Sequence, residues 1–472
     1  MRGAKEGFLS LEEILEATRG RLLAGDPGVR VRGISTDTRS LLPGQMFLAL
    51  EGERFDGHDF VASALAKGAC GAVVRRGKLG SLPPQRNGSR AALVEVEDTL
   101  FALGEMARRW RELHSTVVVG ITGSNGKTTT KEMLASILER SRSVLKNEGN
   151  LNNRIGLPLT LLGLKEHHRA VVLEMGMNEP GEIGRLCQIA RPQVGLITQV
   201  APAHLEGLGS LQGVAREKGE LFLSLGAQGK ALVNLDDPWV VSLARSCEAH
   251  KLSYGTEQGA MVRGLHAEPF HVQGARLCLE VAGDRRWVQL RGQGTPLVRG
   301  ALAAAAGAWA LGASLDEIKE ALESFRPSVG RLHVTSFPQG GTLIDDTYNA
   351  NPASMAAALE LLCKGGEGRT VAVLGEMREL GPLTLSAHRE VGQTAARLGV
   401  KLLVAVGPWA PWVAEGAGKS STEVHAVGNC QEAIELLKGL LRPGDRILVK
   451  GSRAAAMETV AEAIRASRLE VS

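Results

Sequence analysis

The chain has 472 residues, which is too long for a single hydrophobic core, so two to four domains are expected. Hydrophobic residues (44%) and charged residues (22%) occur in the proportions of a soluble globular protein, and a net charge of +4 gives no reason to expect a nucleic-acid or membrane partner. The six cysteines are scattered without a C-x-x-C pair, and the N-terminus lacks the apolar core of a signal peptide. We therefore expect a cytoplasmic protein with free thiols.

The first hundred residues predict a small α/β module. Ser10-Leu-Glu-Glu13 is a capping box that opens a helix, which we expect to end at Gly20. A segment dense in short hydroxyls follows, with a single arginine, and it comprises Ser35, Thr36, Asp37, Thr38 and Arg39. Such a segment is either the polar edge of a scaffold or a holder for a phosphate-bearing ligand, and composition favours neither.

The stretch from 120 to 130 has the features of a phosphate-binding loop. An apolar run at 117–119 predicts a strand before it, and 131–138 predicts a helix after it. Lys127 follows a glycine, and the hydroxyl of Thr128 follows the lysine, which is the arrangement that binds a nucleoside triphosphate with magnesium. The spacing is shorter than the standard loop, a known G-x-x-G-K-T variant. The predicted nucleotide contacts are Gly123, Ser124, Asn125, Gly126, Lys127, Thr128 and Thr129.

Two polar features follow the loop helix. Four amides lie within residues 147–153, which predicts a polar binding loop with Asn150, Asn152 and Asn153 as substrate contacts. Glu174 ends the buried strand predicted at 171–173. Ligands of open parallel sheets bind at the carboxyl ends of strands, so we interpret Glu174 as a magnesium ligand in preference to a helix-capping acid.

Three further side chains are candidates from their positions. His204 lies just past the strand predicted at 194–200, on the sheet edge expected for Glu174, although a lone histidine is usually structural. Lys218 lies in a helical pattern at 214–222, and by itself would be a solvated surface lysine. Asn234 ends a predicted strand and is a candidate adenine contact. Residues 251–292 read as a β-rich appendage, followed by helices at 297–312 and 314–325.

The C-terminal third predicts a second open parallel sheet. A linker at 327–332 leads to a strand at 342–346 that ends in paired acids, and Ser354 is expected to start a helix. Strands then alternate with helices, and each strand ends near glycine, at 370–374, 401–406 and 446–450. The fold class is therefore α/β.

These motifs together resemble the Mur ligases, the ATP-dependent amide-forming enzymes of bacterial cell-wall synthesis. The segments that carry the resemblance span the chain: 35–39, 56–58, 122–129, 149–153, 203–206, 330–331, 345–352, 374–381 and 449–458. The resemblance implies three domains, namely a small N-terminal α/β domain for the UDP end of the substrate (1–98), a central P-loop ATPase with a parallel sheet (99–326) and a C-terminal Rossmann-like domain (327–472).

The resemblance also implies the reaction. Segments 345–352 and 450–453 resemble the corresponding segments of the family branch that joins D-alanyl-D-alanine to UDP-N-acetylmuramoyl-tripeptide. In that branch the reaction passes through an acyl phosphate formed with ATP. Two Mg²⁺ ions are implied, one on Thr128 and Glu174 and one on His204 and Lys218, the lysine carrying CO₂ as a carbamate. Arg331 and Asp346 are implied to meet the nucleotide. The implied substrate contacts in the C-terminal part are Tyr348, Asn349 and Asn351. We expect a monomer without membrane insertion.

Two departures from the family pattern leave alternatives open. The segment Gly294-Thr-Pro-Leu297 replaces the usual Gly-x-His-Asn, and Arg154 replaces an acid after the amide cluster. One alternative is a Mur-type ligase that adds a diamino acid or glutamate. The other is a non-catalytic nucleotide-binding descendant of such a ligase.

Overall fold

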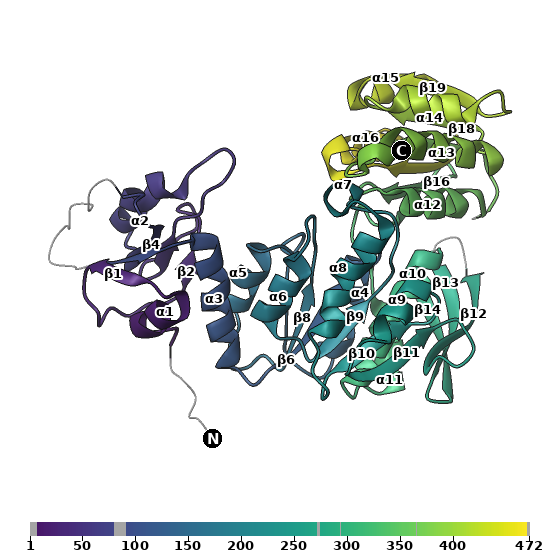
Figure 1. Cartoon of the computed structure of the whole chain (residues 1–472). Coiled ribbons are helices and arrows are strands. Elements are labelled where there is room, and N and C mark those ends of the chain that lie inside the picture. The colour runs from purple at the N-terminus through teal and green to yellow at the C-terminus, as the bar shows by residue number, and fades with distance from the viewer. Residues whose placement is uncertain (1–6, 80–90, 271–273, 293, 365, 470–472) are drawn as a thin grey trace. The chain divides into compact units, whose positions relative to one another are not determined.

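The computed structural model describes residues 7–79, 91–270, 274–292, 294–364 and 366–469. Within these ranges the chain forms three α/β domains around sheets of five, nine and six strands (Figure 1). Internal contacts divide it into two compact units, one of residues 1–120, 141–176 and 181–193 and the other of residues 121–140, 177–180 and 194–472. No helix within the described ranges is long and apolar enough to cross a membrane.

The first unit begins with the predicted small module. Its sheet has the order β1-β5-β4-β3-β2, with β1 antiparallel to β5 and the other neighbours parallel. Ser10 and Glu13 form the predicted capping box of α1, whose last residue is Thr18 and whose left-handed C-cap, Arg19, comes directly before the predicted end at Gly20. The elements are α1 (Leu11–Thr18), β1 (Arg21–Ala24), β2 (Ile34–Ser35), β3 (Met46–Leu48), η1 (Gly57–Phe60), α2 (Val61–Ala66), β4 (Gly71–Arg75) and β5 (Ala92–Val96).

The same unit continues through α3 (Thr99–Glu112), which packs against α5 (Gly156–Leu162) and α6 (Glu182–Ala190). Glu105 of α3 pairs with Arg108 at 2.7 Å and with Arg185 of α6 at 2.8 Å. Burial raises the pKa of Glu105, but the hydrogen bonds from Arg185 and Arg108 outweigh burial and leave the pKa below its ordinary value. Strands β7 (Val144–Lys146) and β8 (Ala170–Glu174) pair in parallel and complete the unit.

The second unit contains most of the nucleotide-binding elements. Strands β9, β10, β11 and β12 run in parallel, and β12, β13 and β14 form an antiparallel meander. Residues 251–292 are therefore rich in β-strands, as predicted, but they extend the central sheet at its edge instead of forming a separate appendage. The strands are β9 (Val194–Ile197), β10 (Lys230–Asn234), β11 (His250–Gly255), β12 (Val262–Phe270), β13 (Gly274–Val281) and β14 (Asp284–Arg291).

The helices of this region cover the sheet (Figure 1). The alanine-rich α10 packs closely on α4, since added methyl groups at Gly300 and Gly307 would lie 3.3 Å from Thr129 and 2.9 Å from Leu134. Gly294 (φ +98°) caps α10, and Pro296 lies in its first turn. The helices are α4 (Lys127–Leu138), α7 (Leu205–Leu208), α8 (Leu211–Leu223), α9 (Pro238–Ala244), α10 (Thr295–Ala310) and α11 (Leu315–Ser324).

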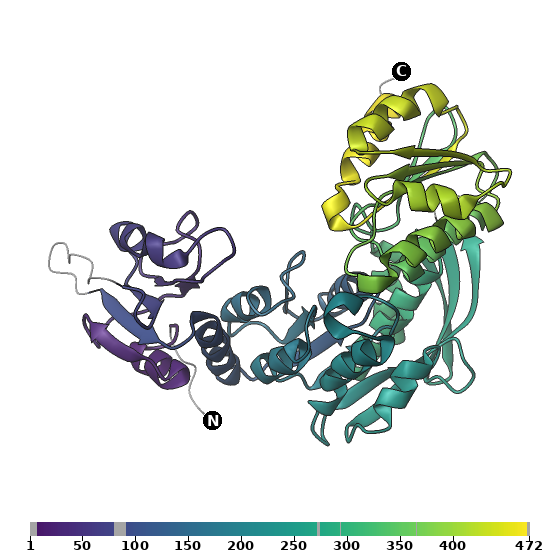
Figure 2. The same ribbon diagram turned by 45° about the horizontal axis from the view of Figure 1, so that its top comes forward.

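The C-terminal sheet has the order β15-β16-β20-β17-β18-β19 and is parallel, as predicted, apart from the antiparallel edge strand β15, which was not predicted. Helices α12–α14 pack on one face of this sheet and α15 and α16 on the other, each group over its own apolar cluster (Figures 1 and 2). Helix α12 begins at Pro352, earlier than predicted, because proline is favoured in a first turn. The elements are β15 (His333–Ser336), β16 (Thr342–Asp346), α12 (Pro352–Lys364), β17 (Thr370–Leu374), η2 (Gly381–Leu383), α13 (Thr384–Arg397), β18 (Leu402–Val406), α14 (Ala410–Ala417), β19 (Glu423–Val427), α15 (Cys430–Leu440), β20 (Arg446–Lys450), η3 (Arg453–Ala455) and α16 (Glu458–Leu469).

Candidate active site

The phosphate-binding loop leaves β6 (Val117–Thr122) and enters α4. Gly123 has φ +147°, and a methyl group there would lie 1.8 Å from the Thr198 hydroxyl, so only glycine fits. Gly126 (φ +80°) is the N-cap of α4 and has open space around its Cα. The glycines therefore form a tight turn that leaves backbone N–H groups at a helix N-terminus, which is an anion-binding arrangement.

Side chains hold this loop in place. The Lys127 Nζ donates to the Gly123 carbonyl at 2.7 Å, and the Thr198 hydroxyl donates to the Asn125 carbonyl at 2.6 Å. The Ser124 hydroxyl donates to the Ala201 carbonyl at 2.8 Å. The loop is thus preorganised with a lysine ammonium beside it, and Ser124 acts by tethering the loop through its side chain.

Residues of the C-terminal domain reach the loop within the same unit. Arg331 donates from Nη2 to the Thr128 hydroxyl at 2.7 Å, and its guanidinium lies 3.8 Å from the centroid of the Tyr348 ring. Asn351 donates from Nδ2 to the Asn125 side-chain oxygen at 2.7 Å. The structure therefore brings together the predicted loop and three of the predicted residues from 331–351.

Asp346 and Asn349 meet a lysine that the sequence analysis did not single out. Lys450 is 1% exposed, and its Nζ lies 2.5 Å from Asp346 Oδ2 and 2.9 Å from the Asn349 carbonyl. The other Asp346 oxygen accepts from the Leu332 N–H at 3.2 Å. Asp346 thus anchors the segment before α12, and its predicted role toward the nucleotide stays a prediction. The signal for Lys450 was its place in the Lys-Gly-Ser-Arg segment.

Lys218 is deeply buried on α8, with 1% exposure. The surface position that its helical pattern alone predicts was therefore wrong. Its Nζ lies 3.8 Å from the Met177 sulfur. Burial lowers the pKa of Lys218 well below its ordinary value, and the nearby charge of Lys127 lowers it further, so the neutral amine is favoured.

His204 precedes α7 in a left-handed conformation (φ +55°), which is strained for a residue with a Cβ. Its Nδ1 lies 2.5 Å from Oε2 of Glu379. Asn234 is buried at the end of β10, where its Nδ2 donates to the Thr198 carbonyl at 2.7 Å and its Oδ1 accepts from the Asp236 N–H at 3.1 Å. Both polar ends of the Asn234 amide are therefore bonded to the backbone beside the loop.

Glu174 lies in the first unit, buried at the end of β8 as predicted. Asn152 donates from Nδ2 to Glu174 Oε1 at 2.7 Å. Asn147 bonds the Glu174 backbone twice, donating to its carbonyl at 3.0 Å and accepting from its N–H at 2.9 Å. The amide segment thus positions the carboxylate. Asn147 was missed as a site residue because its role depends on a strand far along the chain.

The other amides and Arg154 have distinct partners. The Asn153 side-chain oxygen accepts from the N–H groups of Ile155 and Gly156 at 3.1 and 2.9 Å, so it satisfies two backbone donors where α5 begins. Asn150 is exposed. Arg154 lies 3.4 Å from Glu182 of α6, which neutralises the charge that departs from the family pattern.

Family models match residues 30–111 (Mur ligase family, catalytic domain), 121–308 (Mur ligase middle domain) and 330–453 (Mur ligase, glutamate ligase domain). The chain belongs to the Mur ligase family. It is 36% identical to the UDP-N-acetylmuramoyl-tripeptide–D-alanyl-D-alanine ligase of Haemophilus influenzae, covering 97% of each chain, and 34% identical to that of Bacillus subtilis, covering 91% of this chain and 92% of the relative.

Solved structures agree with this assignment. Crystal structure I of MurF from Acinetobacter baumannii superposes with a TM-score of 0.87 at 35% identity, covering 98% of this chain and 99% of that one. MurF from Thermotoga maritima in complex with ADP has a TM-score of 0.81 at 29% identity, covering 92% and 97%. The three-domain α/β fold is thus that of a Mur ligase.

In this Mur ligase, residues 35–39 form a compact turn. Arg39 pairs with the Asp37 carboxylate at 2.6 Å, and this hydrogen bond lowers the pKa of Asp37 to about 2. The Ser35 hydroxyl donates to the Asp37 carbonyl at 3.0 Å, and the Thr38 carbonyl accepts from Lys67 at 2.8 Å. The arginine is therefore neutralised within its own turn, and its binding of a phosphate stays a prediction.

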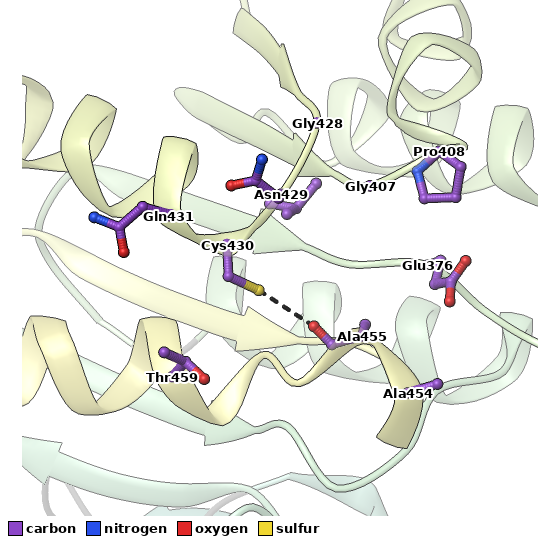
Figure 3. A pocket seen from close by; sticks show the side chains of 11 residues that line it. Glu376, Gly407, Pro408, Gly428, Asn429, Cys430, Gln431, Ala454, Ala455 and Thr459 are labelled. Atoms are coloured by element: carbon purple, nitrogen blue, oxygen red, sulfur yellow. Dashed lines mark hydrogen bonds between the residues drawn. The ribbon is translucent and has the colours of Figure 1, made fainter.

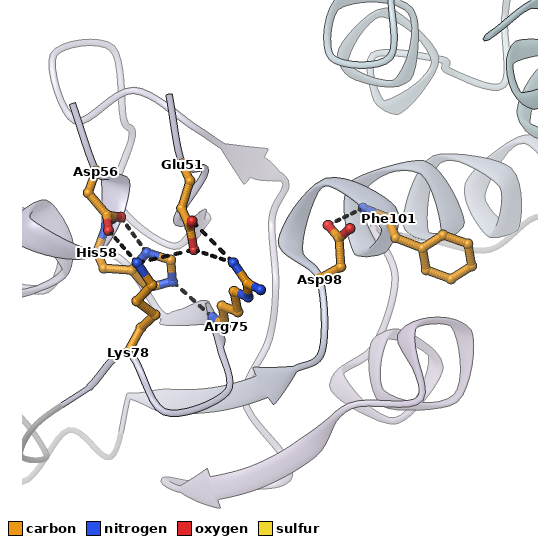
Figure 4. Close-up of polar contacts among 7 residues, drawn as sticks. All are labelled: Glu51, Asp56, His58, Arg75, Lys78, Asp98 and Phe101. Carbon is orange, nitrogen blue, oxygen red and sulfur yellow. Dashed lines mark hydrogen bonds and ion pairs between the residues drawn. The ribbon is translucent and has the colours of Figure 1, made fainter. Parts of the chain in front are cut away.

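An acidic cluster near β4 consists of Glu51, Asp56 and His58 (Figure 4). The His58 Nδ1 lies 2.5 Å from Asp56, and its Nε2 accepts from the Arg75 N–H at 2.9 Å. Lys78 lies 3.1 Å from Asp56, and Arg75 lies 3.2 Å from Glu51. Because both imidazole nitrogens are engaged and both carboxylates face cations, the arrangement holds a loop and does not suit a metal ion.

A cavity of about 490 Å³ lies at the carboxyl ends of the C-terminal strands (Figure 3). Cys430 lines it and donates its thiol to the Ala455 carbonyl at 3.2 Å. Burial raises the pKa of Cys430, with the nearby Glu458 charge adding to the effect, so the thiol is not activated as a nucleophile. Glu376, Pro408, Asn429 and Thr459 are among the other lining residues.

Proposed function

We propose that this chain is an ATP-dependent ligase that joins D-alanyl-D-alanine to UDP-N-acetylmuramoyl-tripeptide in cytoplasmic peptidoglycan precursor synthesis. The observation that carries the proposal is the contact of Arg331 and Asn351 with Thr128 and Asn125 of the phosphate loop. It joins the segment typical of the D-alanyl-D-alanine-adding branch to the nucleotide-binding element. Relatives named UDP-N-acetylmuramoyl-tripeptide–D-alanyl-D-alanine ligase match nearly the full chain and support the same choice.

The reaction follows from the chemistry of the groups involved. A carboxylate and an amine do not condense in water without activation. The tripeptide's terminal carboxylate attacks the γ-phosphorus of ATP, and ADP leaves, which gives an acyl phosphate. The amine of D-alanyl-D-alanine then attacks the acyl carbon, and phosphate leaves. Lys127 and the N-terminus of α4 stabilise the charge on the transferring phosphoryl group, so no protein nucleophile is required.

The donor set suits two Mg²⁺ ions, which would neutralise phosphate charge when bound. Thr128 supplies a hydroxyl, Glu174 a carboxylate and His204 an imidazole, and we propose each as a ligand. Lys218 fits only as a carbamate, formed as R–NH₂ + CO₂ → R–NH–COO⁻ + H⁺. The reaction requires a neutral amine, and the lowered pKa of buried Lys218 supplies one.

Further assignments rest on the family resemblance. We propose domain bounds of 1–98, 99–326 and 327–472. The turn at 35–39 would meet the UDP end of the substrate, and the amides at 150–153 the remainder of it. Residues 348–351 would meet the reacting end, and Arg331 and Asp346 the nucleotide, with Asn234 beside the adenine.

The amine profile tests this function. ADP release is measured with ATP, Mg²⁺ and UDP-N-acetylmuramoyl-tripeptide, while the amine is D-alanyl-D-alanine, glutamate or diaminopimelate. We expect ADP release only when the amine is D-alanyl-D-alanine. Activity with glutamate or diaminopimelate in its place would assign the chain to another Mur branch. Binding of ATP without turnover of any amine would make it a non-catalytic descendant.

A further inference from the structure

The loop that follows β17 contacts the loop before α7. The Glu379 carboxylate lies 2.5 Å from Nδ1 of His204, and the Glu379 carbonyl lies 3.4 Å from the Glu206 N–H. A methyl group added to Gly381 would lie 3.3 Å from the Cα of Glu206, so the two loops are closely packed. A residue of the C-terminal domain thus touches a candidate metal ligand of the central domain.

Both residues of the pair are held in an unusual backbone conformation. His204 has φ +55° and Glu379 has φ +62°, although neither is glycine. Such conformations are strained for residues with a Cβ and persist where surrounding contacts determine them. Side chains on two strained backbones that face each other across a domain contact indicate a functional arrangement more than a surface ion pair.

The surroundings of the pair favour an interaction with Nδ1. The His204 Nδ1 is shielded from solvent, and within the described residues Glu379 is the polar group that meets it, off the line of an ideal hydrogen bond. The neighbouring Arg378 pairs instead with Glu376 at 2.7 Å. A glutamate side chain is ordinarily ionised at neutral pH, so Glu379 meets Nδ1 as a carboxylate.

An ionised carboxylate at Nδ1 determines the tautomer of a neutral imidazole. It attracts an N–H at Nδ1 and repels a lone pair there, so Nδ1 carries the hydrogen and the lone pair is left on Nε2. Histidines that bind metals through one nitrogen commonly donate the other N–H to a carboxylate, which fixes the ring and raises its basicity.

We propose that Glu379 is a positioning residue for His204, which it holds in the Nδ1–H tautomer so that Nε2 is the metal-binding nitrogen. The inference rests on the proposed function in that it takes His204 as a Mg²⁺ ligand. It adds that this ligand is set by the C-terminal domain, through the contact between the two loops. Glu379 therefore acts through His204.

The tautomer is tested directly by ¹⁵N NMR of histidine-labelled protein without metal, at a pH where the imidazole is neutral. The His204 signals are assigned by their loss in His204→Gln. We expect a protonated Nδ1 and an unprotonated Nε2 in the wild type, and a shift toward protonated Nε2 in Glu379→Ala. A wild-type His204 with protonated Nε2, or a tautomer unchanged in Glu379→Ala, would overturn the proposal.

Metal dependence provides the second readout. Mn²⁺ binding is measured by electron paramagnetic resonance, and the Mg²⁺ concentration for half-maximal turnover is measured in parallel. Partners of metal-binding histidines typically contribute about 10- to 100-fold in metal affinity. In Glu379→Ala, the dissociation constant for Mn²⁺ and the Mg²⁺ concentration for half-maximal turnover should therefore both rise by that factor, while kcat at saturating Mg²⁺ is largely kept. Glu379→Gln, whose amide oxygen still accepts from Nδ1–H, should recover part of the loss.

Glu423→Gln is the matched control. Glu423 also pairs with a histidine of the C-terminal domain, His425, at 2.9 Å, but on β19 and in exposed surroundings. The Glu423→Gln variant should leave Mn²⁺ binding and the Mg²⁺ requirement unchanged. An equal loss of metal affinity in this variant would overturn the specific role of Glu379. The NMR measurement needs no turnover, so failure of the ligase assay and failure of this proposal are separate results.

Discussion

Replacing Lys218 separates the chemistry of its amine from the packing of its stem. Lys218→Met keeps most of the buried stem and removes the nitrogen that would add CO₂, whereas Lys218→Ala removes both. Loss of one charge-stabilising group at an active site typically costs about 10²–10³-fold in rate, so turnover should fall at least that far in both variants. ATP binding should stay largely intact, because it depends on the phosphate loop.

The two variants should differ in stability. Among the described residues, the Lys218 Nζ has a single hydrogen-bond contact, the Met177 sulfur at 3.8 Å, so burial of the amine is poorly compensated. Removing a poorly bonded buried polar group gains about 1–3 kcal/mol, which we expect for Lys218→Met. Truncation of a buried side chain to alanine costs about 2–5 kcal/mol through the cavity, so Lys218→Ala should be less stable than Lys218→Met by that amount.

The pH dependence of this difference has a definite sign. The pKa of Lys218 lies well below the ordinary value of 10.5 in the folded protein because the amine is buried. Between the folded and unfolded pKa values the unfolded chain binds one more proton, so wild-type stability rises with pH in that range. The stability gain of Lys218→Met should therefore be largest at pH values below the folded pKa and should shrink as pH approaches 10.5.

Urea unfolding in CO₂-free buffer at several pH values measures the stabilities, and phosphate release measures turnover. A ¹³C NMR signal from ¹³CO₂ that is present in wild type and absent in Lys218→Met would report the carbamate itself. Full turnover in either variant would refute the carbamate role. Equal destabilisation of the methionine and alanine variants would refute the reasoning about the buried amine.

Three further predictions concern other residues. Lys127→Ala should lose phosphoryl transfer, and an unchanged rate of ADP release would remove Lys127 from the mechanism. Lys450→Met should destabilise the protein by about 3–5 kcal/mol in urea unfolding, because it leaves the Asp346 carboxylate without its cation. Adding Asp346→Asn to that variant should recover part of the lost stability. A cost near zero for Lys450→Met would contradict this prediction. Glu105 has a lowered pKa, so its stabilising effect is complete above 4.5 and is lost as pH falls through the folded pKa. Acid should therefore destabilise Glu105→Gln less steeply than wild type, and parallel stability curves would contradict the assignment.

The phosphate loop was predictable because its signals are local. A strand, glycines at the tight turns, a lysine and a hydroxyl occur within about a dozen residues, and each constrains the same turn. The position of Glu174 was predictable for a related reason, since a buried apolar run ending in a carboxylate marks the edge of a parallel sheet.

Partners far apart in the chain were not predictable from pattern alone. Lys218 has the sequence surroundings of a surface lysine, and its burial depends on the packing around α8. Asp346 and Lys450 are 104 positions apart, and nothing local to either shows that they pair. Residues 251–292 were predicted to be β-rich, but their place in the central sheet was missed for the same reason, because pairing of β12 to β11 is a tertiary contact.

Oxygen transfer tests the central claim most directly. UDP-N-acetylmuramoyl-tripeptide labelled with ¹⁸O in its terminal carboxylate is incubated with the enzyme, ATP, Mg²⁺ and D-alanyl-D-alanine. The masses of the products are then determined by mass spectrometry. Attack of the carboxylate on the γ-phosphorus predicts the pentapeptide product together with phosphate that carries one ¹⁸O. Unlabelled phosphate, or ADP formed without the pentapeptide, would contradict the account.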